Sequence, residues 1–195
     1  MPKIVDQEQY RQELLHKSFD LLAEKGYANV TTRQLAQELG ISTGAMYHYF
    51  PSKKALFEQL VEAMGQQDVA ALQHMVAGKH TLGERLASMG TFLIENEAYF
   101  VKQTAIWTDF CINSDSEEVS SNQVFQRVDQ RYCQAIAETL ELRDRRIVQF
   151  IWTLVNGVLL EQVGGHGSAV FAEQITLLID MLTAYLEKLP TDKGH

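Results

Sequence analysis

Apolar residues recur at helical spacing along most of the chain. Gln9–Lys25 is predicted to form the first helix, and Gly26 follows it as a stop signal. The apolar positions of that segment are Leu14, Leu15, Phe19, Leu22 and Ala23. Prolines occur only at positions 2, 51 and 190, so helix breakers are almost absent from the interior. The pattern therefore predicts an all-α chain.

Two short helices separated by a glycine turn follow the first helix. Thr31-Thr32-Arg33-Gln34 reads as a capping box, and the helix that it starts is predicted to end at Gly40. Ser42 can cap a third helix that runs to about Tyr49. The arrangement is a helix-turn-helix motif, although the bare motif also occurs in proteins that do not bind DNA.

Pro51 ends the third helix, and Ser52 can cap a long fourth one. Glycine-rich or polar stretches then divide the remainder into about five more helices, about nine in total. These stretches are residues 78–83, 113–122, 143–146 and 164–167. The last two long helices, roughly Arg145 to Val163 and Ala169 to Leu189, are apolar on more than one face, which indicates a deep bundle position or pairing with another chain.

Composition narrows the class of protein. The 195 residues carry a net charge of −8, which by itself argues against a partner made of phosphates. Two cysteines, Cys111 and Cys133, cannot staple a secreted chain of this length. The start lacks an apolar signal core, and the most apolar stretch, residues 147–160, falls short of the ~20 residues of a membrane span. We expect a cytoplasmic protein without a membrane helix.

Residues 31–56 read TTRQLAQELGISTGAMYHYFPSKKAL, and this segment resembles the DNA-binding domain of the tetracycline-repressor (TetR) family. The marks are Leu35-Ala36, Gly40-Ile41-Ser42, Gly44, Tyr47-His48-Tyr49-Phe50, and Lys53 followed by Leu56. The resemblance implies a helix-turn-helix DNA-binding domain at residues 1–52 and a ligand-binding and dimerisation bundle at 53–195. It also implies a homodimer through the last two long helices, a palindromic double-stranded operator, and a repressor released by a small-molecule effector.

The expected DNA contacts lie on the two short helices and at the start of the fourth. A helix enters a major groove ~12 Å wide only if its leading residues are small or hydrogen-bonding. Met46, Tyr49 and Phe50 fall on the opposite face and are expected to anchor the helix. The predicted DNA-binding residues are Thr31, Thr32, Arg33, Ser42, Thr43, Gly44, Ala45, Tyr47, His48 and Lys53, with Lys54 a weaker candidate.

The bundle supplies aromatic side chains suited to an apolar effector pocket, although aromatics at helical spacing are more often core. The predicted ligand contacts are Phe92, Trp107, Phe110, Trp152 and Asn156. No cofactor is expected. The alternative is a helical enzyme, or a cofactor- or metal-binding bundle, with an incidental helix-turn-helix. Glu13 and His16 have di-iron spacing without a second copy, the histidines form no i, i+4 pair, and no nucleophile motif is present.

The acidic charge is unevenly distributed. Residues 1–62 hold 7 Lys and Arg against 8 Asp and Glu, whereas residues 63–195 hold 10 against 17. A DNA-binding domain of net charge −1 needs a local positive field, which we expect from Arg33, Lys53 and Lys54.

Overall fold

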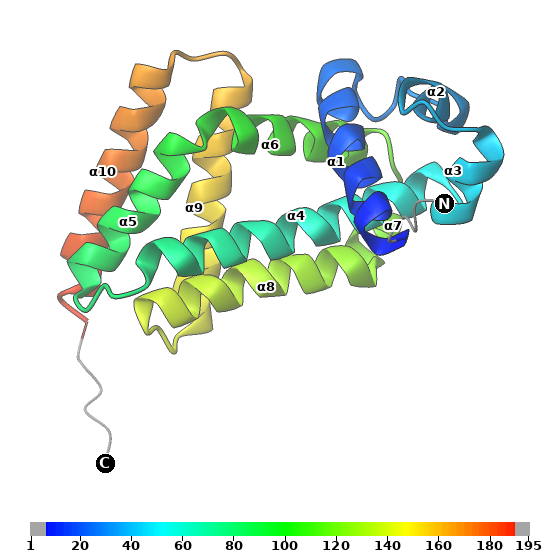
Figure 1. The fold of residues 1–195 in the computed structure, drawn as a ribbon. Coiled ribbons are helices and arrows are strands. Elements are labelled where there is room, and N and C mark those ends of the chain that lie inside the picture. The colour runs from blue at the N-terminus through cyan, green and yellow to red at the C-terminus, as the bar shows by residue number, and fades with distance from the viewer. Residues whose placement is uncertain (1–6, 190–195) are drawn as a thin grey trace. The chain divides into compact units, whose positions relative to one another are not determined.

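The computed structural model describes residues 7–189, and all regular secondary structure within them is helical (Figure 1). The predicted all-α class is thus confirmed. The ten helices are α1 (Gln7–Lys25), α2 (Thr32–Glu38), α3 (Thr43–Tyr49), α4 (Lys53–Val76), α5 (Leu82–Glu95), α6 (Glu97–Ile112), α7 (Ser116–Ser121), α8 (Gln123–Leu140), α9 (Arg145–Val163) and α10 (Ser168–Leu186).

The chain divides into two compact units. Unit 1 comprises residues 7–67 and 102–130 of the described part, and unit 2 comprises residues 68–101 and 131–189. Helices α4, α6 and α8 each contribute residues to both units. Compact packing does not identify which residues bind DNA, so the functional boundary between residues 52 and 53 stays a prediction.

In unit 1, local capping signals set the ends of the short helices. The Thr31 side chain accepts from the Gln34 amide while the Gln34 side chain accepts from the Thr31 amide, as the capping box predicts. Gly40 has φ +70°, and this left-handed turn lets the Ile41 amide reach the Ala36 carbonyl at 3.0 Å. The glycine turn therefore closes α2 and directs the chain into α3.

One helix was not expected. The polar composition of residues 113–122 predicts a connection, but the structure has α7 there, a helix of six residues. Asp115 caps this helix by accepting from the amides of Glu117 and Glu118, at 2.9 and 3.0 Å. Because α7 has no apolar stripe, hydrophobic periodicity could not reveal it.

In unit 2, α10 packs against α5 and α9 (Figure 1). Its buried face consists of Phe171, Ile175, Leu178, Leu182 and Leu186. The approach of α5 is close at Gly90, where an added Cβ would lie 2.9 Å from Cγ1 of Ile179. Any larger residue at this position would force the Ile179 side chain to shift.

Helix α10 is also long and apolar enough to cross a membrane, by length and composition alone. It is the one such helix within residues 7–189, and 28% of its apolar window is buried in the structure. Its other face exposes large apolar residues, among them Leu177, Met181 and Tyr185. The expectation that the chain has no membrane helix stays a prediction.

The Gly90 contact yields a stability prediction. Replacing Gly90 with Val should lower the free energy of unfolding by about 1 to 3 kcal/mol, because the added carbons overpack the α5–α10 contact. Gly83→Val in the same helix is the matched control, since its Cβ would meet nothing within 4 Å. Thermal unfolding monitored by circular dichroism measures both variants. Equal melting temperatures for the two would contradict this account of α5–α10 packing.

Candidate nucleic-acid interface

Helix α3 is held by two fully buried side chains. Met46 and Phe50 are both 0% exposed, whereas Tyr47 is 51% exposed and His48 is exposed. Tyr49 is half-buried, with its ring 5.6 Å from that of Tyr10 in an edge-on contact. These positions confirm the predicted division of α3 into an anchoring face and an outward face.

The leading end of α3 is open. Ser42 caps the helix by accepting from the Ala45 amide at 3.0 Å. Thr43 and Gly44 are exposed and Ala45 is half-buried. A Cβ added at Gly44 would meet only the Ser42 hydroxyl, at 3.9 Å. The helix therefore presents a narrow end with hydroxyl groups, which suits entry into a groove.

Arg33, a predicted DNA-binding residue, lies on α2 with its side chain free of polar contacts in the described part of the chain. Thr31 and Arg33 are exposed and Thr32 is half-buried. Within residues 7–189, Arg33 makes no ion pair and no side-chain hydrogen bond. Lys25, by contrast, pairs with Glu38 at 2.6 Å. The Arg33 guanidinium is thus available to a phosphate.

The Lys53 side chain contacts Tyr27, which belongs to the same unit. Its Nζ donates to the Tyr27 carbonyl at 2.9 Å and lies 4.2 Å from the centre of the Tyr27 ring. Burial lowers the pKa of Lys53, and the nearby Asp109 carboxylate partly opposes that shift. In this structure the ammonium therefore holds the turn between α1 and α2.

The sequence did not single out Tyr27 or Asp109, yet both position the helix-turn-helix. The Tyr27 ring packs 5.0 Å from that of Phe57 and 4.9 Å from that of Phe110. Asp109 accepts from the Ala28 amide at 2.9 Å. Helices α4 and α6 thus both contact the turn between α1 and α2. No local motif signals this contact, because its partners are 81 residues apart.

The predicted ligand residues are divided between the two units. Trp107 and Phe110 belong to unit 1, where Phe110 stacks on Phe57 at 4.3 Å and is 2% exposed. Phe92, Trp152 and Asn156 belong to unit 2. The Asn156 amide donates to the Trp152 carbonyl of its own helix at 2.8 Å. Core packing accounts for Phe110, and the role of all five in ligand binding stays a prediction.

The sequence predictions do not include Asp68, a buried carboxylate in unit 2. Asp68 is 4% exposed and accepts from the hydroxyls of Tyr99 at 2.8 Å and Tyr132 at 2.5 Å. Tyr132 stacks on Trp152 with ring centres 4.6 Å apart. The available signal was an aspartate that interrupts the apolar stripe of the fourth helix between Met64 and Leu72.

Unit 1 is therefore built around a capped helix-turn-helix whose second helix is exposed at its leading end, the geometry of helix-turn-helix DNA-binding proteins. Residues 14–60 match the bacterial regulatory proteins of the TetR family. This match agrees with the resemblance to the TetR family that residues 31–56 carry.

The sequence similarity to two relatives extends beyond the helix-turn-helix. Nucleoid occlusion factor SlmA of Aliivibrio fischeri is 26% identical over 158 residues, which cover 80% of each chain. HTH-type transcriptional regulator BetI of Brucella anthropi is 24% identical over 194 residues, which cover 95% of this chain and 98% of BetI.

Solved structures share the fold. A transcriptional regulator from Saccharomonospora viridis in complex with choline has a TM-score of 0.69 at 19% identity, covering 91% of this chain and 97% of its own. FadR from Bacillus subtilis in complex with stearoyl-CoA has a TM-score of 0.67 at 16% identity, with coverages of 86% and 97%. At these identities the likeness concerns the fold alone.

The Asp68 cluster predicts an unusual titration. Burial and the Asp68 charge raise the pKa of Tyr99, so its phenol stays protonated in the folded protein when ordinary tyrosines ionise near pH 10. Because the unfolded phenol ionises first, this contribution to stability is complete below about pH 10 and is lost at higher pH.

Absorbance at 295 nm between pH 9 and pH 11 measures the ionised tyrosines. Tyr99→Phe should leave the rise of the folded protein unchanged, but in denaturant it should remove the share of one of the 7 tyrosines. A smaller rise in the folded variant than in the folded wild type would contradict the prediction.

Proposed function

We propose that this protein is a ligand-responsive transcriptional repressor that binds a palindromic operator as a homodimer and is released by a small-molecule effector. The observation that carries the proposal is the exposed, Ser42-capped α3 on its buried anchors, Met46 and Phe50, within a segment that matches a family of regulatory proteins. The cytoplasm, where such a protein meets its operator, is its proposed location.

Each exposed residue of the interface has a proposed role. Thr43, Gly44 and Ala45 enter the major groove, where the Thr43 hydroxyl reads a base edge. Tyr47 and His48 donate to backbone phosphates beside the groove, and Arg33 reaches a phosphate from α2. Thr31 and Ser42 position the helices as caps. Lys53 supports the interface by holding the Tyr27 carbonyl.

The dimer is proposed to form through α9 and α10. Both helices expose large apolar side chains that a single copy leaves in water: Phe150 at 61%, Leu160 at 52%, Leu177 at 60% and Met181 at 62% exposed. An apolar face of this extent on two adjacent helices is typical of an interface. A two-fold dimer can then present two copies of α3 one helical turn of DNA apart, ~34 to 36 Å.

The effector is proposed to bind in unit 2, where Asp68, Tyr99, Tyr132 and Trp152 combine a carboxylate with aromatic rings. Choline and stearoyl-CoA, bound by two proteins of the same fold, are the first compounds to test for release of DNA. A ligand lowers operator affinity if it binds best to a dimer state in which the spacing of the two α3 helices does not match the operator half-sites. DNA then lowers the affinity for the ligand by the same factor.

DNA binding by α2 and α3 is tested by substitution. Arg33→Ala should weaken binding to all duplexes several-fold and reduce the slope of log affinity against log salt by about 1 per protomer, because one phosphate contact is lost. Lys17→Ala, which removes an exposed charge from α1, is the control for net charge. Thr43→Val should instead alter the preferred sequence.

Fluorescence anisotropy with labelled duplexes over a salt series measures these effects. If Arg33→Ala and Thr43→Val bound DNA as the wild type does, the proposed interface would be wrong.

Dimerisation is tested on the apolar face. Leu177→Asp should convert the dimer to a monomer at micromolar concentration, because the interface would have to bury an unpaired carboxylate. Ile112→Asp is the matched control, since Ile112 is 77% exposed on α6 and lies outside the proposed interface. Light scattering coupled to size-exclusion chromatography gives the mass of each. A monomeric wild type, or a dimeric Leu177→Asp, would refute this interface.

A further inference from the structure

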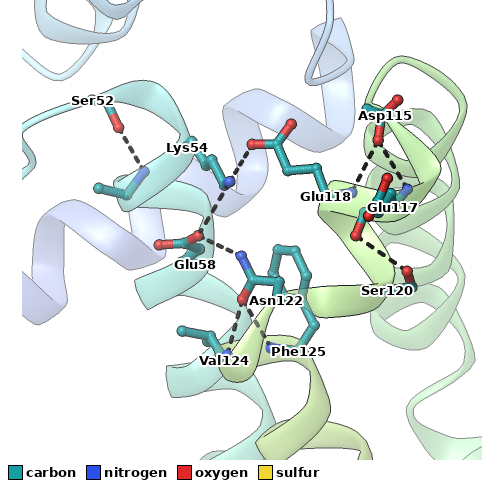
Figure 2. A network of polar contacts seen from close by, with 11 residues as sticks. Ser52, Lys54, Glu58, Asp115, Glu117, Glu118, Ser120, Asn122, Val124 and Phe125 are labelled. Atoms are coloured by element: carbon teal, nitrogen blue, oxygen red, sulfur yellow. Dashed lines mark hydrogen bonds and ion pairs between the residues drawn. The ribbon is translucent and has the colours of Figure 1, made fainter.

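A network of polar contacts in unit 1 joins the start of α4 to α7 and to the start of α8 (Figure 2). The Lys54 ammonium forms a hydrogen-bonded ion pair with the Glu118 carboxylate. It also lies 4.0 Å from Glu58, one turn along its own helix. Lys54 is therefore neutralised from two sides.

Polar contacts hold the acidic side of this network in place. None of the six residues of α7 is buried. The Asn122 amide donates to Glu58 at 2.6 Å, and its carbonyl oxygen accepts from the Val124 amide at 2.9 Å to start α8. An exposed ion pair such as Lys54–Glu118 contributes little to stability, so a competing anion can displace it at small cost.

Lys54 occupies a place from which a cation can reach DNA. It is the second residue of α4, which begins four residues after α3 ends. The free amides of a first helical turn favour an anion at the same place. Lys53 uses one of its three N–H donors on the Tyr27 carbonyl, and Lys54 is the next cation along the same first turn.

Unit 1 carries net negative charge, so each cation that can contact a phosphate has a large effect on DNA binding. The described residues of unit 1 include 8 Lys and Arg against 12 Asp and Glu, a net of −4. Asp115, Glu117 and Glu118 bring three of these carboxylates into one exposed segment. A phosphate backbone approaching α3 thus competes with Glu118 for Lys54.

We propose that α7 is an internal competitor of DNA, in which Glu118 holds Lys54 in an ion pair that the operator phosphates must displace. The inference rests on the proposed DNA-binding function. Any partner or conformational change that draws α7 away from α4 would raise operator affinity without touching α3. The segment is then a second point of control, separate from the effector site.

The test compares two neighbouring glutamates in the full-length protein. Glu118→Gln should tighten binding by roughly 2-fold to 5-fold, the range of an exposed ion pair, and steepen the salt slope by about 1 per protomer. Glu117→Gln removes the same charge from the same helix, but the Glu117 side chain makes no hydrogen bond or ion pair within the described residues. It should change affinity less and leave the slope unchanged.

Lys54→Ala completes the cycle. It should weaken binding little in the wild type, and in the Glu118→Gln background it should remove the whole gain. The probe is a labelled duplex recovered from a random pool by the wild-type protein, and circular dichroism melting checks that each variant is folded.

Equal affinity and salt slope for Glu118→Gln and Glu117→Gln would overturn the inference. So would an equal effect of Lys54→Ala in both backgrounds. Failure of the wild type to recover any duplex would overturn the proposed function instead, so the two failures can be told apart.

Discussion

A helix of seven residues is not stable in water on its own, and α3 is a helix of this length. Its position depends on Met46 and Phe50, which are removed entirely from solvent, and truncating a buried Phe to Ala costs about 3 to 5 kcal/mol. The turn at Tyr27, held by Lys53 and Asp109, supports the helices beneath. The exposed face of α3 is therefore held in place by the burial of its other face.

Few of the cations near α3 are free of contacts with other side chains or the backbone. The Lys53 ammonium stabilises the turn at Tyr27, and the Lys54 ammonium is paired with Glu118. Arg33 is exposed. An acidic DNA-binding unit with few available cations binds non-specific DNA weakly. Under the proposed function, stable binding then requires two half-sites engaged at once by one dimer, which favours operators over the rest of the chromosome.

Much of this could be predicted from the sequence, because local signals carry it. The helix-turn-helix, its caps and the two faces of α3 follow from Thr31, Gly40, Ser42 and the apolar spacing. Helix α7 could not be predicted, since Asp115 caps a segment without an apolar stripe. The contacts of Asp109 and Asp68 join residues distant in sequence, so only the folded chain shows them.

We propose that paired copies of α3 read a palindromic operator. Selection of bound duplexes from a random pool, followed by sequencing, tests this mode of binding most directly. We expect enrichment of an inverted repeat whose half-site centres lie about 10 base pairs apart, or a multiple of that. Enrichment of no sequence, or of single half-sites without a fixed spacing, would contradict it.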